Sequence, residues 1–328
     1  MDLTGLFSKR CVLVTGKGGV GRSTVTAALA LAAARRGRRV LVSEVGDEGQ
    51  GHSPLARHFG RERLPEVRPA PLAPGVEAVE LLARVGQELF LATVLHAATL
   101  AHAAMSSEAL RRMVNAGPSF REMGVYFQLL TLLRARRPEG DPLHELILVD
   151  MPATGHTLSL TGLPELLLRL VPRGPIAEAL REGQGYMNDP AQAAAWTVTL
   201  PETLPVSECL ELLDGLRRTA MPAGGVFVNR IPRDPFTAAE REGLAALIAR
   251  HRLLGAEGFH RLEGCACELR RLQAGTALPV IGLPELEGGP SLATDLSLAL
   301  EGADPVEELL AVPRPARGAA PAAGSLLA

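Results

Sequence analysis

C-V-L-V-T-G-K-G-G-V-G-R-S-T, residues 11–24, is a short apolar run followed by a glycine-rich segment and a pair of hydroxyl residues. The apolar run at 11–14 is typical of a buried strand in a parallel sheet, because both faces of such a strand are covered. The glycines let the backbone turn sharply and aim several N–H groups at one point. A helix is expected at Val25–Arg36, and its N-terminus adds partial positive charge there. The stretch therefore predicts a strand, a phosphate-binding loop and a helix.

The loop fits the phosphate-binding pattern G-x-x-x-x-G-K-[ST] at every fixed position except one. Arg22 stands where the pattern has lysine, and Ser23 retains a hydroxyl of the kind that ligates Mg²⁺. Arg22 leaves two interpretations open: a general replacement of lysine by arginine, or a loop that binds a nucleotide but hydrolyses it poorly. Lys17, inside the loop, and Lys9 are the only two lysines among 34 basic residues. A lysine retained here favours a role that needs its compact ammonium group.

The composition excludes several classes of partner. The 328 residues carry a formal net charge of −2, and only 3% of them are aromatic. Neither a basic surface nor a platform for base stacking is indicated, so no nucleic acid is expected as a partner. Four cysteines are too few for a disulfide scaffold of this size and favour a reducing compartment. The N-terminus lacks the apolar core of a signal peptide, and we expect a cytoplasmic protein.

One long apolar run resembles a membrane span in length. Leu89–Ser107 contains no Asp, Glu, Lys or Arg. It is rich in alanine, however, and contains two histidines and several hydroxyl residues, which make insertion into a bilayer unfavourable. We expect a buried or groove-lining helix.

The rest of the chain alternates strand-like and helix-like segments. This predicts an α/β fold with a doubly wound, mostly parallel sheet and right-handed crossovers, together with an inserted helical subdomain. Further strands are expected at 40–43, 76–80, 146–149, 197–200, 226–228 and 279–283. Helical insertions are expected at about 81–137, with a break at 115–118, and at about 163–195; further helices follow Pro205 and cover 237–251 and 260–273. The segment 60–75 reads as a surface connection. We expect one domain over 1–312 and a disordered tail, rich in Pro and Ala, over 313–328.

Polar residues follow several of the expected strands. The strand at 146–149 ends on Asp150, which begins the segment D-M-P-A-T-G-H-T, and the strand at 40–43 continues into E-V-G-D at 44–47. The strand at 226–228 is followed by Asn229. A carboxylate directly after an apolar strand lies where nucleotide-binding α/β proteins place a group linked to Mg²⁺.

Four segments in this order resemble the ArsA-type ATPases, which include anion-pump motors and the ATPase that targets tail-anchored membrane proteins. They are the loop at 16–24, the strand end near Glu44, the D-x-P-x-T-G-H-T segment at 150–157 and the V-N-R segment at 228–230. The resemblance implies a P-loop ATPase that uses ATP and Mg²⁺. It also implies a homodimer, or a heterodimer with a paralogue, that closes on ATP and opens on hydrolysis, with a membrane channel or membrane-protein client as a further partner.

The resemblance also assigns roles to individual residues. It implies that Lys17 reaches across the dimer to phosphates held by the partner and that Asp150 senses the γ-phosphate through Mg²⁺ and water. Ser23 would hold Mg²⁺ with Asp150, Thr24 would reach the α-phosphate, and Asn229 would read the adenine edge. The remaining cofactor-binding residues form the loop that wraps the phosphates: Gly16, Gly18, Gly19, Val20, Gly21 and Arg22.

Two positions depart from the family pattern. Arg22 replaces a lysine, and the family's water-orienting aspartate falls on Gly46 if Glu44 takes the acidic position at the strand end. Asp47, one residue later, is then the candidate catalytic carboxylate, provided that the loop shifts. A weakened nucleotide-binding subunit that acts with an active paralogue is therefore the alternative. A positioning ATPase of the MinD and ParA kind is disfavoured, because the tail lacks a basic amphipathic helix.

Two further features have a structural and a functional interpretation. Met105, Met113, Met123, Phe120 and Phe127 either pack in the core or line a groove for an apolar client. Cys265 and Cys267 are either incidental cysteines or half of a zinc site completed by a second chain. The targeting ATPases have a C-x-x-C pair at the dimer interface, whereas this pair has a single intervening residue. No cysteines match an arsenite site, and His156 reads as a structural hydrogen-bonding residue.

Overall fold

The computed structural model describes residues 3–46, 51–95, 118–152, 154–170, 172–302 and 306. Over these residues the chain forms one eight-stranded sheet in the order β3-β4-β2-β5-β1-β6-β7-β8. The strands are β1 (Cys11–Gly16), β2 (Val40–Val45), β3 (Ala70–Ala73), β4 (Val76–Leu81), β5 (Leu146–Asp150), β6 (Ala193–Thr199), β7 (Ala223–Ile231) and β8 (Val280–Pro284). Only the pair at the edge, β3 with β4, is antiparallel among these strands. The predicted α/β fold with a mostly parallel sheet is confirmed.

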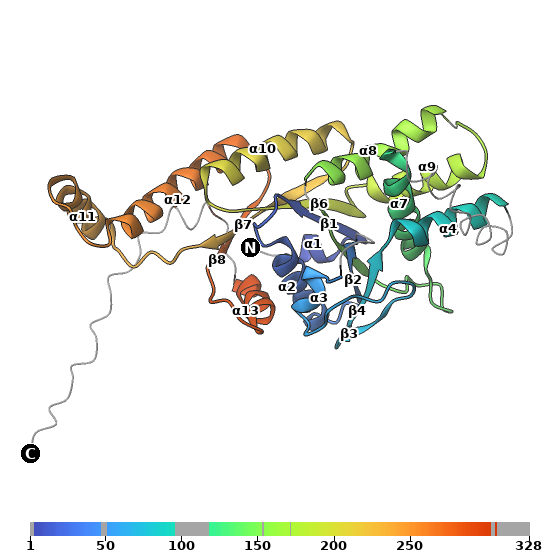
Figure 1. Ribbon diagram of the computed structural model, residues 1–328, viewed down its shortest axis with the longest axis horizontal. Coiled ribbons are helices and arrows are strands. Elements are labelled where there is room, and N and C mark those ends of the chain that lie inside the picture. Colours follow the sequence, from blue (N-terminus) through green and yellow to red (C-terminus); the bar gives the residue numbers. More distant parts are fainter. Residues whose placement is uncertain are drawn as a thin grey trace, which may run out of the picture.

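Helices cover both faces of the sheet (Figure 1). One face carries α2 (Arg22–Arg35), α3 (Pro54–Arg57) and α13 (Leu292–Ala299), and the other carries α10 (Thr203–Arg218) and α12 (Ala256–Gly275). The α10 face also carries α7 (Pro118–Arg134), α8 (Thr154–Leu170) and α9 (Pro175–Met187), which contact β4, β1 and β6 respectively. The helix α4 (Ala83–Leu95) packs against α7. The remaining elements are α1 (Thr4–Phe7), α11 (Ala238–Arg250) and a 3₁₀ turn at Leu300–Gly302.

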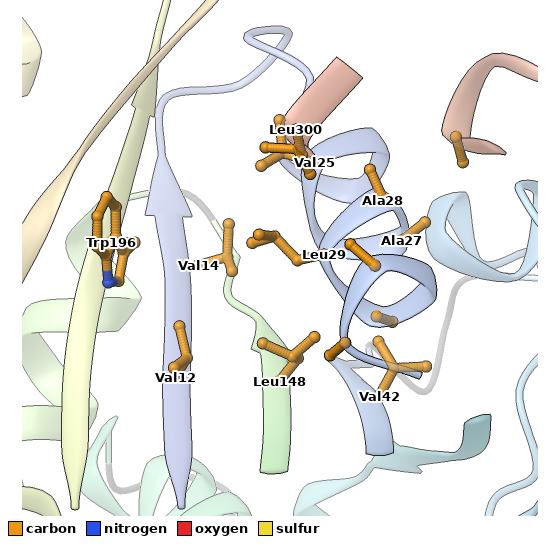
Figure 2. Close-up of a cluster of buried hydrophobic side chains, with 14 of the residues drawn as sticks. Val12, Val14, Val25, Ala27, Ala28, Leu29, Val42, Leu148, Trp196 and Leu300 are labelled. Carbon is orange, nitrogen blue, oxygen red and sulfur yellow. The ribbon is translucent and has the colours of Figure 1, made fainter. Parts of the chain in front are cut away.

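The strand residues alternate between two apolar cores. Val12 and Val14 of β1 belong to the core on the α2 side, whereas Leu13 belongs to the core on the α10 side. Figure 2 shows side chains of α2, among them Leu29, facing those of β1, β5 and β2. Because β1 is buried on both faces and lies in the middle of the sheet, its C-terminal end opens at the point where the strand order reverses. Ligands of such sheets bind at that point.

Several expected boundaries were wrong. The helical block expected up to residue 195 ends earlier, because α9 ends at Met187 and Ala193–Ala195 are buried in β6. The segment 60–75 is not only a connection, because it contains β3, which pairs with β4 at the edge of the sheet. Pro71 is tolerated in an edge strand. The helix α10 begins at Thr203, two residues before Pro205, and α13 was not expected.

Several segments for which the sequence makes a prediction lie outside the described residues. These include the tail at 313–328, Met105, Met113, most of the run Leu89–Ser107 and the break before Pro118. Met123 and Phe127 are buried, which confirms the core interpretation for these two residues. Within the described ranges, no helix has the length and apolar character needed to cross a bilayer.

The crossing of α4 and α7 depends on two glycines. A Cβ on Gly86 would lie 1.7 Å from the carbonyl oxygen of Gly124, and one on Gly124 would lie 2.2 Å from that of Ala83. Gly124→Ala should therefore lower the free energy of unfolding by about 1–3 kcal/mol, as measured by urea denaturation, because backbone atoms must move apart. Gly162→Ala on α8, whose nearest neighbour would be a methyl group at 3.6 Å, is the matched control and should not destabilise the protein. Equal stabilities of the two variants would contradict this close crossing.

Candidate functional site

The loop between β1 and α2 is exposed to solvent at residues 17–19. Lys17, Gly18 and Gly19 are exposed, whereas Val20 is buried and anchors the loop. Gly19 and Gly21 have φ values of 84° and 90°, a region that favours glycine. A Cβ on Gly16 would lie 2.3 Å from the carbonyl oxygen of Val198 on β6. The loop therefore turns sharply, as its glycines predict, and a Cβ added at Gly18 or Gly19 would meet open space.

Asn229 of β7 supports this loop. Its Nδ2 donates a hydrogen bond of 2.9 Å to the carbonyl oxygen of Val20, and its side chain is buried. A Cβ on Gly21 would lie 2.3 Å from the same Nδ2, so this brace needs glycine at position 21. The sequence indicates Asn229 as a site residue. It does not predict the hydrogen bond to Val20, because the two residues are 209 positions apart. Its predicted role at the adenine edge stays a prediction.

Ser23 and Asp150 meet beneath the loop. Ser23 Oγ donates to Asp150 Oδ2 at 2.5 Å, and β5 pairs with β1 so that Asp150 lies beside Val14. Asp150 is 4% exposed, and its Oδ1 has no hydrogen-bond partner among the described residues. Burial raises the pKa of this carboxyl to about 7, against the opposing effects of the Ser23 hydrogen bond and the Arg22 charge. A hydroxyl beside a half-satisfied buried carboxylate is a donor set that fits Mg²⁺.

The first residues of α2 are tied to neighbouring segments. The Arg22 guanidinium donates to the carbonyl oxygen of Met151, directly after β5. Thr24 Oγ1 lies 3.1 Å from Nε2 of His58, whose pKa is lowered by burial. No pattern in the sequence points to His58, because its contact with Thr24 depends on where α3 packs. Arg22 and Thr24 thus flank the loop, and their predicted phosphate contacts stay predictions.

The 150–157 segment is also tied to β1. Thr157 is buried and its Oγ1 lies 2.8 Å from Oγ1 of Thr15, while Met151 N donates to the carbonyl oxygen of Val14 at 2.9 Å. A change at Asp150 is thus connected through short contacts to both β1 and the start of α8. The side chain of His156 lies outside the described part of the chain.

Lys17 makes an ion pair within its own chain. Its Nζ lies 2.6 Å from Glu208 Oε1 on α10, with the two side chains 50% and 20% exposed. Such exposed pairs contribute about 0–1 kcal/mol, so the pair is easily broken. The structure therefore leaves the ammonium group available to another partner.

Three carboxylates lie in one row across neighbouring strands. The register pairs Glu44 of β2 with Asp150 of β5 on one side and with Glu80 of β4 on the other. Glu44 Oε2 accepts hydrogen bonds from Ser53 Oγ at 2.6 Å and from Leu55 N at 3.0 Å, at the start of α3. Asp47 lies outside the described residues, so its predicted role has no structural test. Glu80 was not singled out from the sequence.

The two cysteines of interest lie on α12. Cys265 is buried, and burial raises the pKa of its thiol to about 11, whereas Cys267 is exposed. Residues two apart on a helix point about 200° away from each other, so the pair is a poor fit for one shared ion. Both line a cavity of about 540 Å³ beside the ends of β6, β7 and β8. No group of three or more potential metal ligands occurs among the residues that the structure describes.

Comparisons with known proteins agree with this geometry. A family model described as anion-transporting ATPase, ArsA_ATPase, matches residues 9–174, about half of the chain. ATPase BagA of Mycobacterium tuberculosis is 32% identical over 257 residues, which cover 72% of this chain and 71% of the relative. An uncharacterised protein of Streptomyces coelicolor, SCO2128, is 33% identical over 54% of this chain and 44% of its own. The matched region contains the loop, Asp150 and the segment that follows it, and the chain therefore belongs to the ArsA family of anion-transporting ATPases.

Proposed function

We propose that this protein is a cytoplasmic, dimeric, Mg²⁺-dependent ATPase that couples its nucleotide state to a membrane or apolar protein partner. The observation that carries the ATPase part is the contact of Ser23 with the half-satisfied, buried Asp150 beneath an open glycine loop. A buried carboxylate oxygen without a partner is costly, and a divalent cation would satisfy it. The family assignment supports ATP as the nucleotide.

Each part of the loop has a distinct task in this proposal. The amides of the exposed residues 17–19 and the N-terminus of α2 would bind the phosphates, and Asn229 keeps the loop in shape. Ser23 and Asp150 would hold Mg²⁺, which would supply positive charge next to the bound phosphates. Binding of Mg²⁺ would favour release of the proton from Asp150, whose pKa is raised by burial.

The dimer part of the proposal rests on Lys17. Its ammonium group pairs with α10 and is half exposed, so nucleotide binding need displace only a weak surface pair. We propose that it then reaches phosphates held by a second subunit, in the manner of an arginine finger supplied in trans. The partner part rests on the family resemblance alone.

The alternative is a nucleotide-binding subunit with little turnover, which Arg22 favours because its guanidinium is engaged with Met151. We expect Arg22→Lys to change kcat at saturating ATP by no more than about tenfold, which corresponds to about 1.4 kcal/mol. The positive charge survives the change, and one hydrogen bond to a carbonyl is lost. Single-turnover and steady-state hydrolysis assays would measure the effect. A gain of about a hundredfold or more would favour the alternative.

A further inference from the structure

We propose that Glu80 is a catalytic residue of this site, whose carboxylate accepts a hydrogen bond from the water that attacks the γ-phosphate. The inference rests on the proposed ATP hydrolysis and assigns a residue that the loop motifs do not contain. Four observations carry it: the row in which Glu80 lies, the lack of a hydrogen bond or ion pair to its carboxylate within the described ranges, its fixed backbone and its contact with Gly46.

Glu80 lies in the same row as the proposed magnesium ligand. Strand pairing places Glu80, Glu44 and Asp150 side by side on β4, β2 and β5. Two positions before each of them on the same strand lies a residue of the core on the α2 side. These residues are Ala78, Val42 and Leu148, respectively. Because side chains alternate along a strand, all three carboxylates point to the face of the sheet where α2 begins. The backbones of Glu80 and Asp150 are two strand spacings apart, about 10 Å.

The three carboxylates differ in their contacts. Asp150 accepts from Ser23, and Glu44 accepts from the start of α3. Over the described ranges the Glu80 carboxylate has neither a hydrogen bond nor an ion pair at all, although the residue is half-buried. Burial first, and then the charges of Glu44 and Glu66, raise its pKa. Among the described residues, Glu80 is thus the carboxylate of this row that accepts no hydrogen bond and forms no ion pair.

The backbone of Glu80 is held on both sides. Its N–H donates to the carbonyl oxygen of Pro65 at 2.7 Å, and its carbonyl oxygen accepts from Gln128 Nε2 at 3.1 Å. The same Gln128 accepts from Leu82 N at 2.8 Å. A carboxylate on a fixed backbone is suited to orient a small reactant, because little ordering is needed when the reactant arrives.

The Glu80 carboxylate fills the space of the side chain that Gly46 lacks. A Cβ on Gly46 would lie 2.0 Å from Oε1 of Glu80, 2.6 Å from Cδ and 2.8 Å from Cγ. Gly46 is not among the glycines with positive φ, so the backbone conformation does not demand glycine here. Glycine is needed because Glu80 takes its space. A carboxylate from β4 therefore stands where one from position 46 would otherwise project.

This placement matches what phosphoryl transfer needs from the protein. With Ser23 and Asp150 engaged at the cation, a separate acceptor must orient the attacking water. The water oxygen bonds to the γ-phosphorus as the bond to the bridging oxygen breaks, and that oxygen leaves on ADP with the electron pair. The Glu80 carboxylate takes the water proton and returns it to the phosphate product. No other reactant is required.

Glu80→Gln tests the proposal, because it keeps the size of the side chain and removes the basic oxygen. We expect kcat to fall by about 10²-fold or more, while the calorimetric Kd of Mg²⁺-ATP changes less than about threefold, or about 0.6 kcal/mol. Glu77→Gln is the matched control, since Glu77 lies on the same strand, faces away and contacts His144. It should leave kcat unchanged.

A rescue separates a catalytic role from a structural one. The double variant Glu80→Ala with Gly46→Asp places a carboxylate from the residue after β2 into the space that Glu80 vacates. We expect its kcat to be at least about tenfold higher than that of Glu80→Ala alone. This test stands even if Glu80→Gln fails to fold. An active wild type whose turnover survives Glu80→Gln, or a double variant with no recovery, would overturn the role of Glu80. A wild type that binds ATP without any turnover would instead overturn the proposed function.

Discussion

Asp150→Asn should abolish Mg²⁺-dependent ATP hydrolysis and, at the same time, stabilise the nucleotide-free protein at neutral pH. Asparagine keeps the shape of the side chain but loses the charge that holds the cation. A bound cation contributes several kcal/mol to charge stabilisation in such reactions, so kcat should fall by about 10²-fold or more. Hydrolysis at saturating ATP and Mg²⁺ would measure the loss.

The stabilisation follows from the raised pKa of Asp150. The folded-state pKa is about 7, above the value of 3.8 for an unperturbed carboxyl, because burial disfavours the charged form. Between about pH 4 and pH 7 the unfolded chain has released this proton and the folded chain retains it, so stability falls as the pH rises through this window. The cost is fully present above pH 7 and amounts to at most about 4 kcal/mol.

Urea denaturation at pH 5 and pH 8, without nucleotide or magnesium, would measure this cost. The stability advantage of Asp150→Asn over the wild type should be larger at pH 8 than at pH 5, because the variant cannot ionise at this position. Asp214→Asn, at an exposed position of α10, is the control and should show no such pH-dependent advantage. Parallel pH profiles for Asp150→Asn and the wild type would contradict the account of a buried, half-satisfied carboxyl.

Lys17→Ala should lower kcat by about 10³-fold, which is the lower end of the effect of a cation supplied in trans. Stability should change little, because Lys17 is half exposed and its pair with Glu208 contributes about 1 kcal/mol at most. Glu208→Gln is the matched control: it breaks the same ion pair but keeps the ammonium group, so turnover should persist. Equal losses of kcat in Lys17→Ala and Glu208→Gln would show that turnover depends on the ion pair rather than on the ammonium group of Lys17.

A mixing experiment tests whether Lys17 acts across subunits. Lys17→Ala retains an intact Ser23, and Ser23→Ala retains an intact Lys17, so each mixed dimer contains one complete site if the lysine acts in trans. Turnover of the mixture should exceed that of either variant alone. No gain on mixing would place Lys17 in its own site or remove it from the reaction.

The sequence predicted the parts of the site that depend on local pattern. The apolar run before Gly16 predicted β1, and Asp150 was recognised because it directly follows an apolar strand. The start of β6 was missed, because Ala193–Ala195 carry no helix or strand periodicity and are assigned only by their burial between β1 and β7. Local pattern is therefore sufficient for the loop but not for alanine-rich boundaries.

Contacts between distant segments could not be predicted from the pattern. The brace from Asn229 to Val20 and the approach of Glu80 to Gly46 depend on strand order and register, which the sequence alone does not specify. Within its own segment, Gly46 indicates only that the family's water-orienting aspartate is missing. The neighbouring strand supplies a carboxylate in the same space, which changes the meaning of that glycine.

Titration calorimetry of the wild type with ATP and Mg²⁺ tests the central claim most directly, because that claim is a triphosphate site built on residues 16–24 and Asp150. We predict one ATP bound per chain, with measurable heat, and weaker binding of ATP in Ser23→Ala when Mg²⁺ is present. The absence of any heat at millimolar ATP and Mg²⁺ would contradict the account.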